Sequence, residues 1–209
     1  MIDSLQHLHV TLSSVSTVRS GILLARKQAK TKSEYRYFLL TLKSFNQNAF
    51  LESKYFDIYD ATEALGKEYL TMSGDIVIRL SSPYTAVLID ETTSNCVISS
   101  NFALIRTDKT KVLPEFLYWY LNTDSVKAEI RKNNGRSMLG TIHTQFYSDL
   151  KIQLPSLQQQ KIIADLYALS LQESSLLKKL AEEKAKYHKE IIQQTYNKFM
   201  GGMIKITSV

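Results

Sequence analysis

The sequence predicts an α+β protein: a β-rich globular domain followed by one long C-terminal α-helix that forms a coiled-coil arm. Short β-branched and aromatic runs, separated by turn residues, fill most of the first 154 residues, which is typical of strands. After Pro155 the apolar residues recur every three or four positions, and no Gly or Pro follows until Gly201. We therefore expect a domain over 1–154, a helix over 155–200 and a tail over 201–209.

Alternating or β-branched runs give the strands in order along the domain. Strands are expected before Gly21 and over residues 35–42, 76–80, 86–89, 97–105 and 150–154. A helical turn is expected at 61–65, and Pro114, which suits a first helical turn, starts a helix that runs to 121 and resumes at 125–130. The stretch 131–137 follows as a basic loop around a flexible Asn-Asn-Gly.

The long helix begins with a clear signal. Ser156 and Gln159 form an S-x-x-Q capping box, in which each side chain can satisfy a backbone N–H group. About 44 residues at about 1.5 Å rise would span about 66 Å, far longer than the usual helix. Its apolar seam has a period near 3.5, with Glu173 and Glu183 on the same face, and it consists of Ile162, Leu166, Leu169, Leu176, Leu180 and Tyr187.

Such a seam calls for a partner helix. The alternative is an ordinary amphipathic helix that lies on its own domain, but this helix is too long to be covered by a small domain. We therefore expect an arm used for pairing.

Composition limits the partners without selecting one. The chain has 209 residues and 26 basic against 20 acidic side chains, and its net charge of +6 favours an anionic partner such as nucleic acid.

Cys96 is the only cysteine, so an intrachain disulfide and a Cys-rich zinc site are excluded, and a reducing cytosol is expected. The N-terminus has no secretory signal pattern, and no apolar stretch is long enough to span a membrane. Because the chain starts at Met1, we expect a complete product.

Motifs for catalysis are missing. The sequence has no phosphate-binding glycine loop and no nucleophile elbow. His7 and His9 would share one face of a strand, but His143 and His188 are distant, so no metal and no cofactor are predicted. Cys96 is expected to be a small core residue.

The remaining features fit DNA binding. Basic and amide side chains gather in several loops, and these are the groups that contact phosphates and base edges. The candidate DNA-binding residues are Lys27, Lys30, Lys32, Arg36, Arg79, Tyr84, Arg131, Lys132, Asn133, Asn134 and Arg136.

Three residue sets, in this order and spacing, resemble the specificity (S) subunits of type I restriction–modification systems. They are Gly74-Asp75-Ile76-Val77-Ile78 with the residues before it from Tyr69, then Asn101 to Arg106 followed by Leu113 to Tyr118, and finally Asp149 to Ile163. Two departures are small: Gln159 stands where the family has an acidic residue, and Arg136 separates Gly135 from Ser137.

The resemblance implies a target-recognition domain followed by a long helix. A full S subunit has two such units in tandem with antiparallel helices, whereas this chain has one. The resemblance therefore implies a half-subunit that forms a homodimer and reads an inverted-repeat target of double-stranded DNA.

Modification (M) subunits would dock on the arms and supply adenine methylation from S-adenosylmethionine, whereas this chain lacks their N-P-P-[YF] motif and is expected to be non-catalytic. Whether a restriction (R) subunit joins stays open. The alternatives are a coiled-coil scaffold that binds no DNA and an enzyme in its own right.

Overall fold

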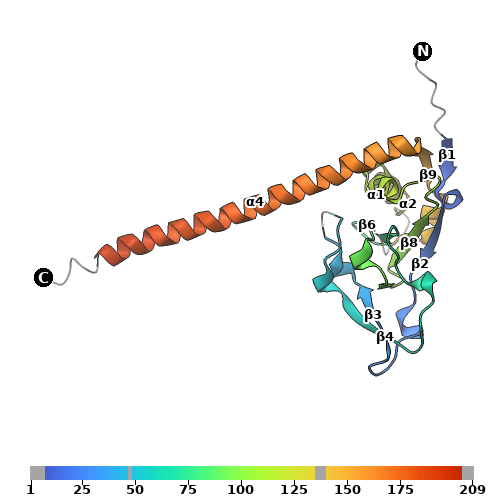
Figure 1. Ribbon diagram of the computed structural model, residues 1–209, viewed down its shortest axis with the longest axis horizontal. Helices are drawn as coiled ribbons and strands as arrows, with labels where there is room; N and C mark the ends of the chain where they lie inside the picture. The colour runs from blue at the N-terminus through green and yellow to red at the C-terminus, as the bar shows by residue number, and fades with distance from the viewer. Residues whose placement is uncertain (1–7, 47–48, 135–139, 204–209) are drawn as a thin grey trace, which may run out of the picture. The chain divides into compact units, whose positions relative to one another are not determined.

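The computed structural model describes residues 8–46, 49–134 and 140–203 and divides the chain into two units (Figure 1). The first unit, Met1–Asp165, holds all the described strands and is called the N-terminal unit. The second unit is Leu166–Val209, and its described residues are the rest of helix α4 (Leu157–Met203); the helical residues 166–203 are called the arm. A β-rich domain followed by a long helix is the predicted α+β class, which is confirmed.

The described strands of the N-terminal unit form three sheets. A four-stranded antiparallel sheet has the order β2 (Ser16–Ser20), β8 (Phe102–Thr107), β5 (Ile76–Arg79), β6 (Ala86–Leu88). A three-stranded sheet has the order β4 (Asp57–Ala61), β3 (Tyr35–Leu40), β7 (Val97–Ile98), in which β3 and β4 are antiparallel and β3 and β7 are parallel. The smallest sheet pairs β1 (Leu8–Thr11) with β9 (Lys151–Leu154).

One apolar cluster joins the two larger sheets. Val77 and Leu104 from the four-stranded sheet pack in the same buried cluster as Leu40 and Ile98 from the three-stranded sheet. Val77 of β5 packs in this cluster, whereas Ile76 and Ile78 are buried on the opposite face of the strand. A strand covered on both faces needs apolar residues at every position, which explains the Ile-Val-Ile run. The cluster holds the two sheets together as one domain.

Short helices precede the last strand. Helix α1 (Pro114–Leu121) begins at a proline and buries Phe116 and Leu117. It is followed by α2 (Asp124–Asn134) and α3 (Thr144–Asp149). The β1–β9 pair then closes the unit, and the capping box at the start of α4 is formed as predicted: the Gln159 N–H donates to Ser156 Oγ at 3.3 Å and the Ser156 N–H donates to Gln159 Oε1 at 3.0 Å.

Several local predictions are wrong. The expected strand 97–105 is two strands in different sheets, because the chain turns at 99–101 to cross from one sheet to the other. The expected helical turn at 61–65 is absent, since Ala61 is the last residue of β4, and a 3-10 turn forms later at Lys67–Tyr69. Helix α3 was not predicted.

The ends of two helices also differ from expectation. Residues 131–134 were expected in a loop, but they form the last turn of α2, because its backbone continues without a glycine until Gly135. Helix α4 continues through the glycines at 201–202 to Met203, so these residues do not end it.

Candidate nucleic-acid interface

Residues 27–36 carry the first group of predicted DNA-binding residues and run beside strand β4. The Ala29 N–H donates to the Asp60 carbonyl at 2.8 Å, and the Thr62 N–H donates to the Lys27 carbonyl at 2.9 Å. The Ser33 N–H donates to the Asp60 side chain at 3.1 Å. These bonds bring Lys27, Lys30, Lys32 and Arg36 to the same end of the β3–β4 hairpin.

Two of these four cations are engaged within the chain. Arg36 forms a two-pronged pair with Asp60, through contacts of 3.0 and 3.1 Å, and these bonds hold the pKa of the Asp60 carboxyl below its usual range. Lys27 pairs with Glu63 at 2.8 Å and lies over the Tyr69 ring. Both pairs are partly exposed, so phosphate oxygens could compete for these cations.

Lys30 and Lys32 differ from the other two cations. Both are exposed, and neither has an ion-pair partner among the residues that the structure describes. Of this group, they are therefore the most available for phosphate contact.

Arg79 and Tyr84 lie together at the turn between β5 and β6. An Arg79 NH2 group donates to the Ser82 carbonyl at 3.1 Å, while its buried Nε has no partner in the described structure, and burial lowers the pKa of this guanidinium. Tyr84 has a left-handed backbone, with φ of 56°, and its hydroxyl donates to the Gly140 carbonyl at 2.8 Å. The turn therefore lies beside Gly140 and Thr141.

The last turn of α2 carries the remaining candidates. Arg131, Lys132 and Asn133 are exposed, and the Asn133 amide donates to the Glu129 carbonyl at 3.1 Å within the helix. Asn134 is the last residue of α2, and Arg136 lies outside the described residues. Cations at a helix C-terminus also stabilise the helix dipole, so their position has a structural role besides any contact with DNA.

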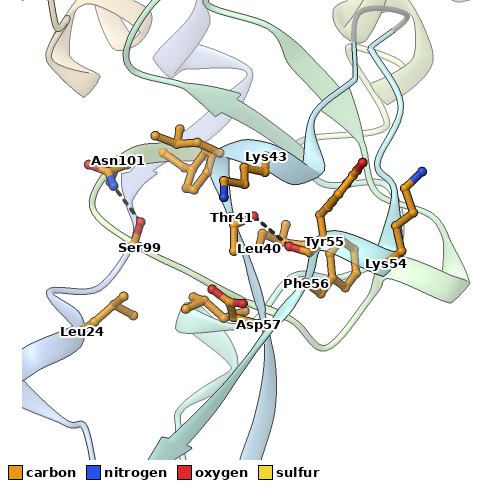
Figure 2. A pocket seen from close by; sticks show the side chains of 13 residues that line it. Leu24, Leu40, Thr41, Lys43, Lys54, Tyr55, Phe56, Asp57, Ser99 and Asn101 are labelled. Carbon is orange, nitrogen blue, oxygen red and sulfur yellow. Dashed lines mark hydrogen bonds between the residues drawn. The ribbon is translucent and has the colours of Figure 1, made fainter.

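A pocket of about 500 Å³, which sequence reasoning missed, opens beside the end of β3 (Figure 2). Lys43, Asp57 and Asn101 line it together with apolar walls that include Leu40 and Phe102. These residues come from separate segments between residues 24 and 102 that only the folded sheets bring together. Composition and spacing carry no signal of such a site.

The seam on α4 was predicted from spacing alone, and its residues are exposed in the single chain. Ile162, Leu166, Leu169, Leu176, Leu180 and Tyr187 each retain more than half of their accessible surface. Large apolar residues that stay exposed on one face of a helix indicate a docking surface.

Three further features concern a metal site, a nucleophilic thiol and a membrane-spanning helix. The described residues contain no cluster of His, Cys, Asp and Glu that could hold a metal, and His7 lies outside them. Burial raises the pKa of the Cys96 thiol to about 11, so this buried residue is a poor nucleophile, as expected. Among the helices of the described part of the chain, none is long and apolar enough to cross a membrane.

Comparison with known proteins identifies the family. The model of the type I restriction modification DNA specificity domain matches residues 9–183, which is most of the chain. This chain belongs to that family. Specificity subunits of this family are generally non-catalytic. No individually curated protein matches the sequence.

Solved structures of specificity subunits share the fold. One belongs to work on complex assembly and conformational transition of the type I R-M system, with a TM-score of 0.66 and 17% identity over 90% of this chain and 48% of that chain. Another is the HsdS subunit from Thermoanaerobacter tengcongensis, with a TM-score of 0.66 and 14% identity over 93% of this chain and 50% of that chain. The present chain therefore spans about half the length of these specificity subunits.

The residue sets that resemble the specificity family contact one another in the fold. Asp75, from the first set, is buried and accepts two bonds of 2.7 Å from Arg106, at the end of the stretch 101–106 in the second set. Gln160, from the third set, is also buried, and its Oε1 accepts the Leu113 N–H at 2.8 Å. Its Nε2 donates to the carbonyls of Lys111 and Pro155. Asp75, Arg106 and Gln160 thus join separate segments of the specificity domain.

Proposed function

We propose that this chain is the DNA-recognition subunit of a type I restriction–modification system and that it works as a homodimer paired through α4. Each copy reads one half-site, so the dimer reads a bipartite inverted repeat. Methyltransferase (M) subunits dock on the paired arms and carry out the chemistry, and restriction (R) subunits are further candidate partners. The observation that carries this proposal is the exposed seam on α4 in a chain that spans about half of its solved relatives.

In the proposed dimer, the seam on α4 forms the contact between the two copies. A full-length relative is about twice as long as this chain, and a second copy would supply the missing half. The half-exposed leucines of the seam would be buried against the same residues of that copy, which is the self-complementary contact of a two-fold dimer.

Charge supports an antiparallel arrangement of the two helices. Residues 157–177 contain Lys161 against Asp165 and Glu173, which gives a net charge of −1. Residues 178–203 contain six lysines against three glutamates, which gives +3. Parallel helices would place the two positive halves side by side, whereas antiparallel helices place each beside a weakly negative half.

The first experiment measures mass by light scattering across a dilution series, followed by selection from a pool of randomised duplexes with the full-length chain. We expect twice the chain mass and an enriched inverted repeat with a fixed spacer. A strict monomer at all concentrations would refute the homodimer. A dimer that enriches no sequence would instead favour a coiled-coil scaffold.

The basic groups are tested by salt dependence. Replacing Arg131 and Lys132 together with alanine should weaken binding of the selected duplex and reduce the slope of log K against log salt by about 2 per protomer, because each phosphate contact contributes about 0.9. The matched control replaces the exposed Lys67 and Lys109, which lie outside the predicted interface. Equal slopes for both double variants would remove the end of α2 from the interface.

A further inference from the structure

The pocket beside the end of β3 has a construction that suits a ligand. Its walls come from β3, the turn after it (Leu42–Ser44), the turn Ser53–Tyr55 with the start of β4, and residues 99–102 before and at the start of β8. Leu40 and Phe102 are buried and form part of the apolar wall. Its volume of about 500 Å³ is within the range of small-molecule sites.

Two oppositely charged side chains line this pocket without neutralising each other. Lys43 and Asp57 both point toward the middle of the pocket in Figure 2. Neither forms an ion pair or a side-chain hydrogen bond with any residue that the structure describes. The neighbouring Lys54, by contrast, is held by Glu52 at 2.8 Å and lies over the Tyr55 ring.

A pocket with an unpaired acceptor and an unpaired cation fits a ligand that has both a hydrogen-bond donor and a negative charge. A nucleotide within DNA offers this combination when its base carries an exocyclic amino group on the major-groove edge, as cytosine and adenine do. A carboxylate accepts a bond from such an amino group, whereas it repels phosphates and the carbonyl oxygens of guanine and thymine. Lysine contacts phosphate as a point charge.

We propose that this pocket reads one base of the DNA target, namely a cytosine or an adenine, with Asp57 accepting a hydrogen bond from the exocyclic amino group. Lys43 contacts the phosphate of the same or the neighbouring nucleotide. The Asn101 side chain, exposed at the pocket wall, supplies a further donor and acceptor. This assignment rests on the proposed DNA-recognition function and adds to it a specificity-determining residue outside the predicted basic segments.

The test compares sequence preferences rather than affinity alone. The wild-type chain, Asp57→Asn and Asp57→Ala are each used to select from the same pool of randomised duplexes, and the enriched duplex is then varied one base pair at a time in fluorescence-anisotropy titrations. We expect one position in each half-site at which the wild type prefers cytosine or adenine by about tenfold, and at which Asp57→Ala, which has no acceptor, discriminates less than about threefold. Asp57→Asn keeps an acceptor oxygen but gains an amide donor, so its preference at that position should shift toward adenine, which asparagine binds through N6 and N7. Preferences at the other positions should remain.

Lys43→Ala gives a second, different signature. It should weaken binding by a similar factor for every sequence and lower the salt slope by about 1 per protomer, because a phosphate contact carries no sequence information. Glu115→Gln and Lys109→Ala are the matched controls, since both residues are exposed and lie outside the pocket. Unfolding curves followed by the fluorescence of Trp119, the only tryptophan, verify that each variant is folded.

The outcomes separate this inference from the function on which it rests. If the wild type enriches a sequence and the Asp57 variants enrich the same one with unchanged ratios, the pocket assignment is overturned and DNA recognition stands. A uniform loss at all positions would also overturn the reading role of Asp57. If the wild type enriches nothing, both proposals fall.

Discussion

The two parts of helix α4 meet very different surroundings. In its first turns, Gln160 is fully buried and Ala164 nearly so, because they pack on the N-terminal unit to which they belong. In the arm, Leu166 and Leu169 each retain more than 60% of their accessible surface. The first part of the helix completes a fold, and the second presents an apolar surface with no partner among the described residues of its own unit. Stability of the N-terminal unit and association through the arm should therefore respond to different substitutions.

The largest expected effect on the N-terminal unit is at the Asp75–Arg106 pair. Asp75 is 2% exposed and accepts two bonds from Arg106 and one from the Met72 N–H. Arg106→Met would leave a buried carboxylate without its cation, so we expect a loss of about 3–5 kcal/mol in the free energy of unfolding. Urea unfolding followed by Trp119 fluorescence measures it. The control, Arg19→Met at an exposed position of β2, should change the value by less than about 0.5 kcal/mol.

The next effect concerns Gln160, which bonds the start of α4 to the segment before α1. Gln160→Leu keeps the size of the side chain but leaves the Leu113 N–H and two carbonyls without their partner, and we expect roughly 2–3 kcal/mol of destabilisation in the same assay. Gln158→Leu, two residues earlier in the helix and exposed, is the matched control and should be near neutral. Equal effects at the two glutamines would show that the buried bonds contribute nothing specific.

Local features of the fold could be predicted from the sequence more reliably than tertiary ones. Elements governed by local chemistry were predictable: the capping box at Ser156, the proline that starts α1, and the Ile-Val-Ile strand β5. The break in 97–105 was not, because it depends on Gly21 and Ile22, far earlier in the chain. The Ile22 N–H donates to the Ile98 carbonyl at 2.9 Å, and a Cβ on Gly21 would collide with the Ser99 backbone.

The candidate site shows the same division. The basic character of residues 27–36 is visible in the sequence, but the pairing of Arg36 with Asp60 joins residues 24 positions apart and arises only from the β3–β4 register. The charges of Lys43 and Asp57 are visible too, yet their shared pocket is not, since it needs both larger sheets in place. Residue type is local information, whereas pairing and pocket geometry are tertiary.

A smaller effect is expected from pH at Cys96, buried between the two larger sheets. Burial raises the pKa of its thiol to about 11 in the folded chain, above the ordinary value of about 8.5 to 9. An acid whose pKa is higher in the folded state is stabilising below its unfolded pKa, and this contribution is lost as pH rises from about 9 to 11. At pH 10 we expect the wild type to lose about 1 kcal/mol more than Cys96→Ala, relative to pH 7.5. Parallel urea curves at both pH values measure this difference, and identical losses would contradict a raised thiol pKa.

The smallest expected effect on unfolding is in the arm, where the effect on association should be largest. Leu176→Gln with Leu180→Gln removes two seam residues that are already more than half exposed in the single chain. Trp119 lies in α1 and therefore reports on the N-terminal unit, so its urea curve at low protein concentration should shift by less than about 0.5 kcal/mol. Light scattering should show dimer dissociation at concentrations at least 100-fold higher than for the wild type, because four leucines per dimer lose their burial.

The control for the arm places glutamines on another face of the same helix, as Ser174→Gln with Ala181→Gln, and should leave the dimer intact. If the seam variant instead destabilised the monomeric N-terminal unit by several kcal/mol, the seam would be covering its own domain. The contrast between the two parts of α4 would then disappear. A dimer unchanged by the seam variant would require pairing through a different surface.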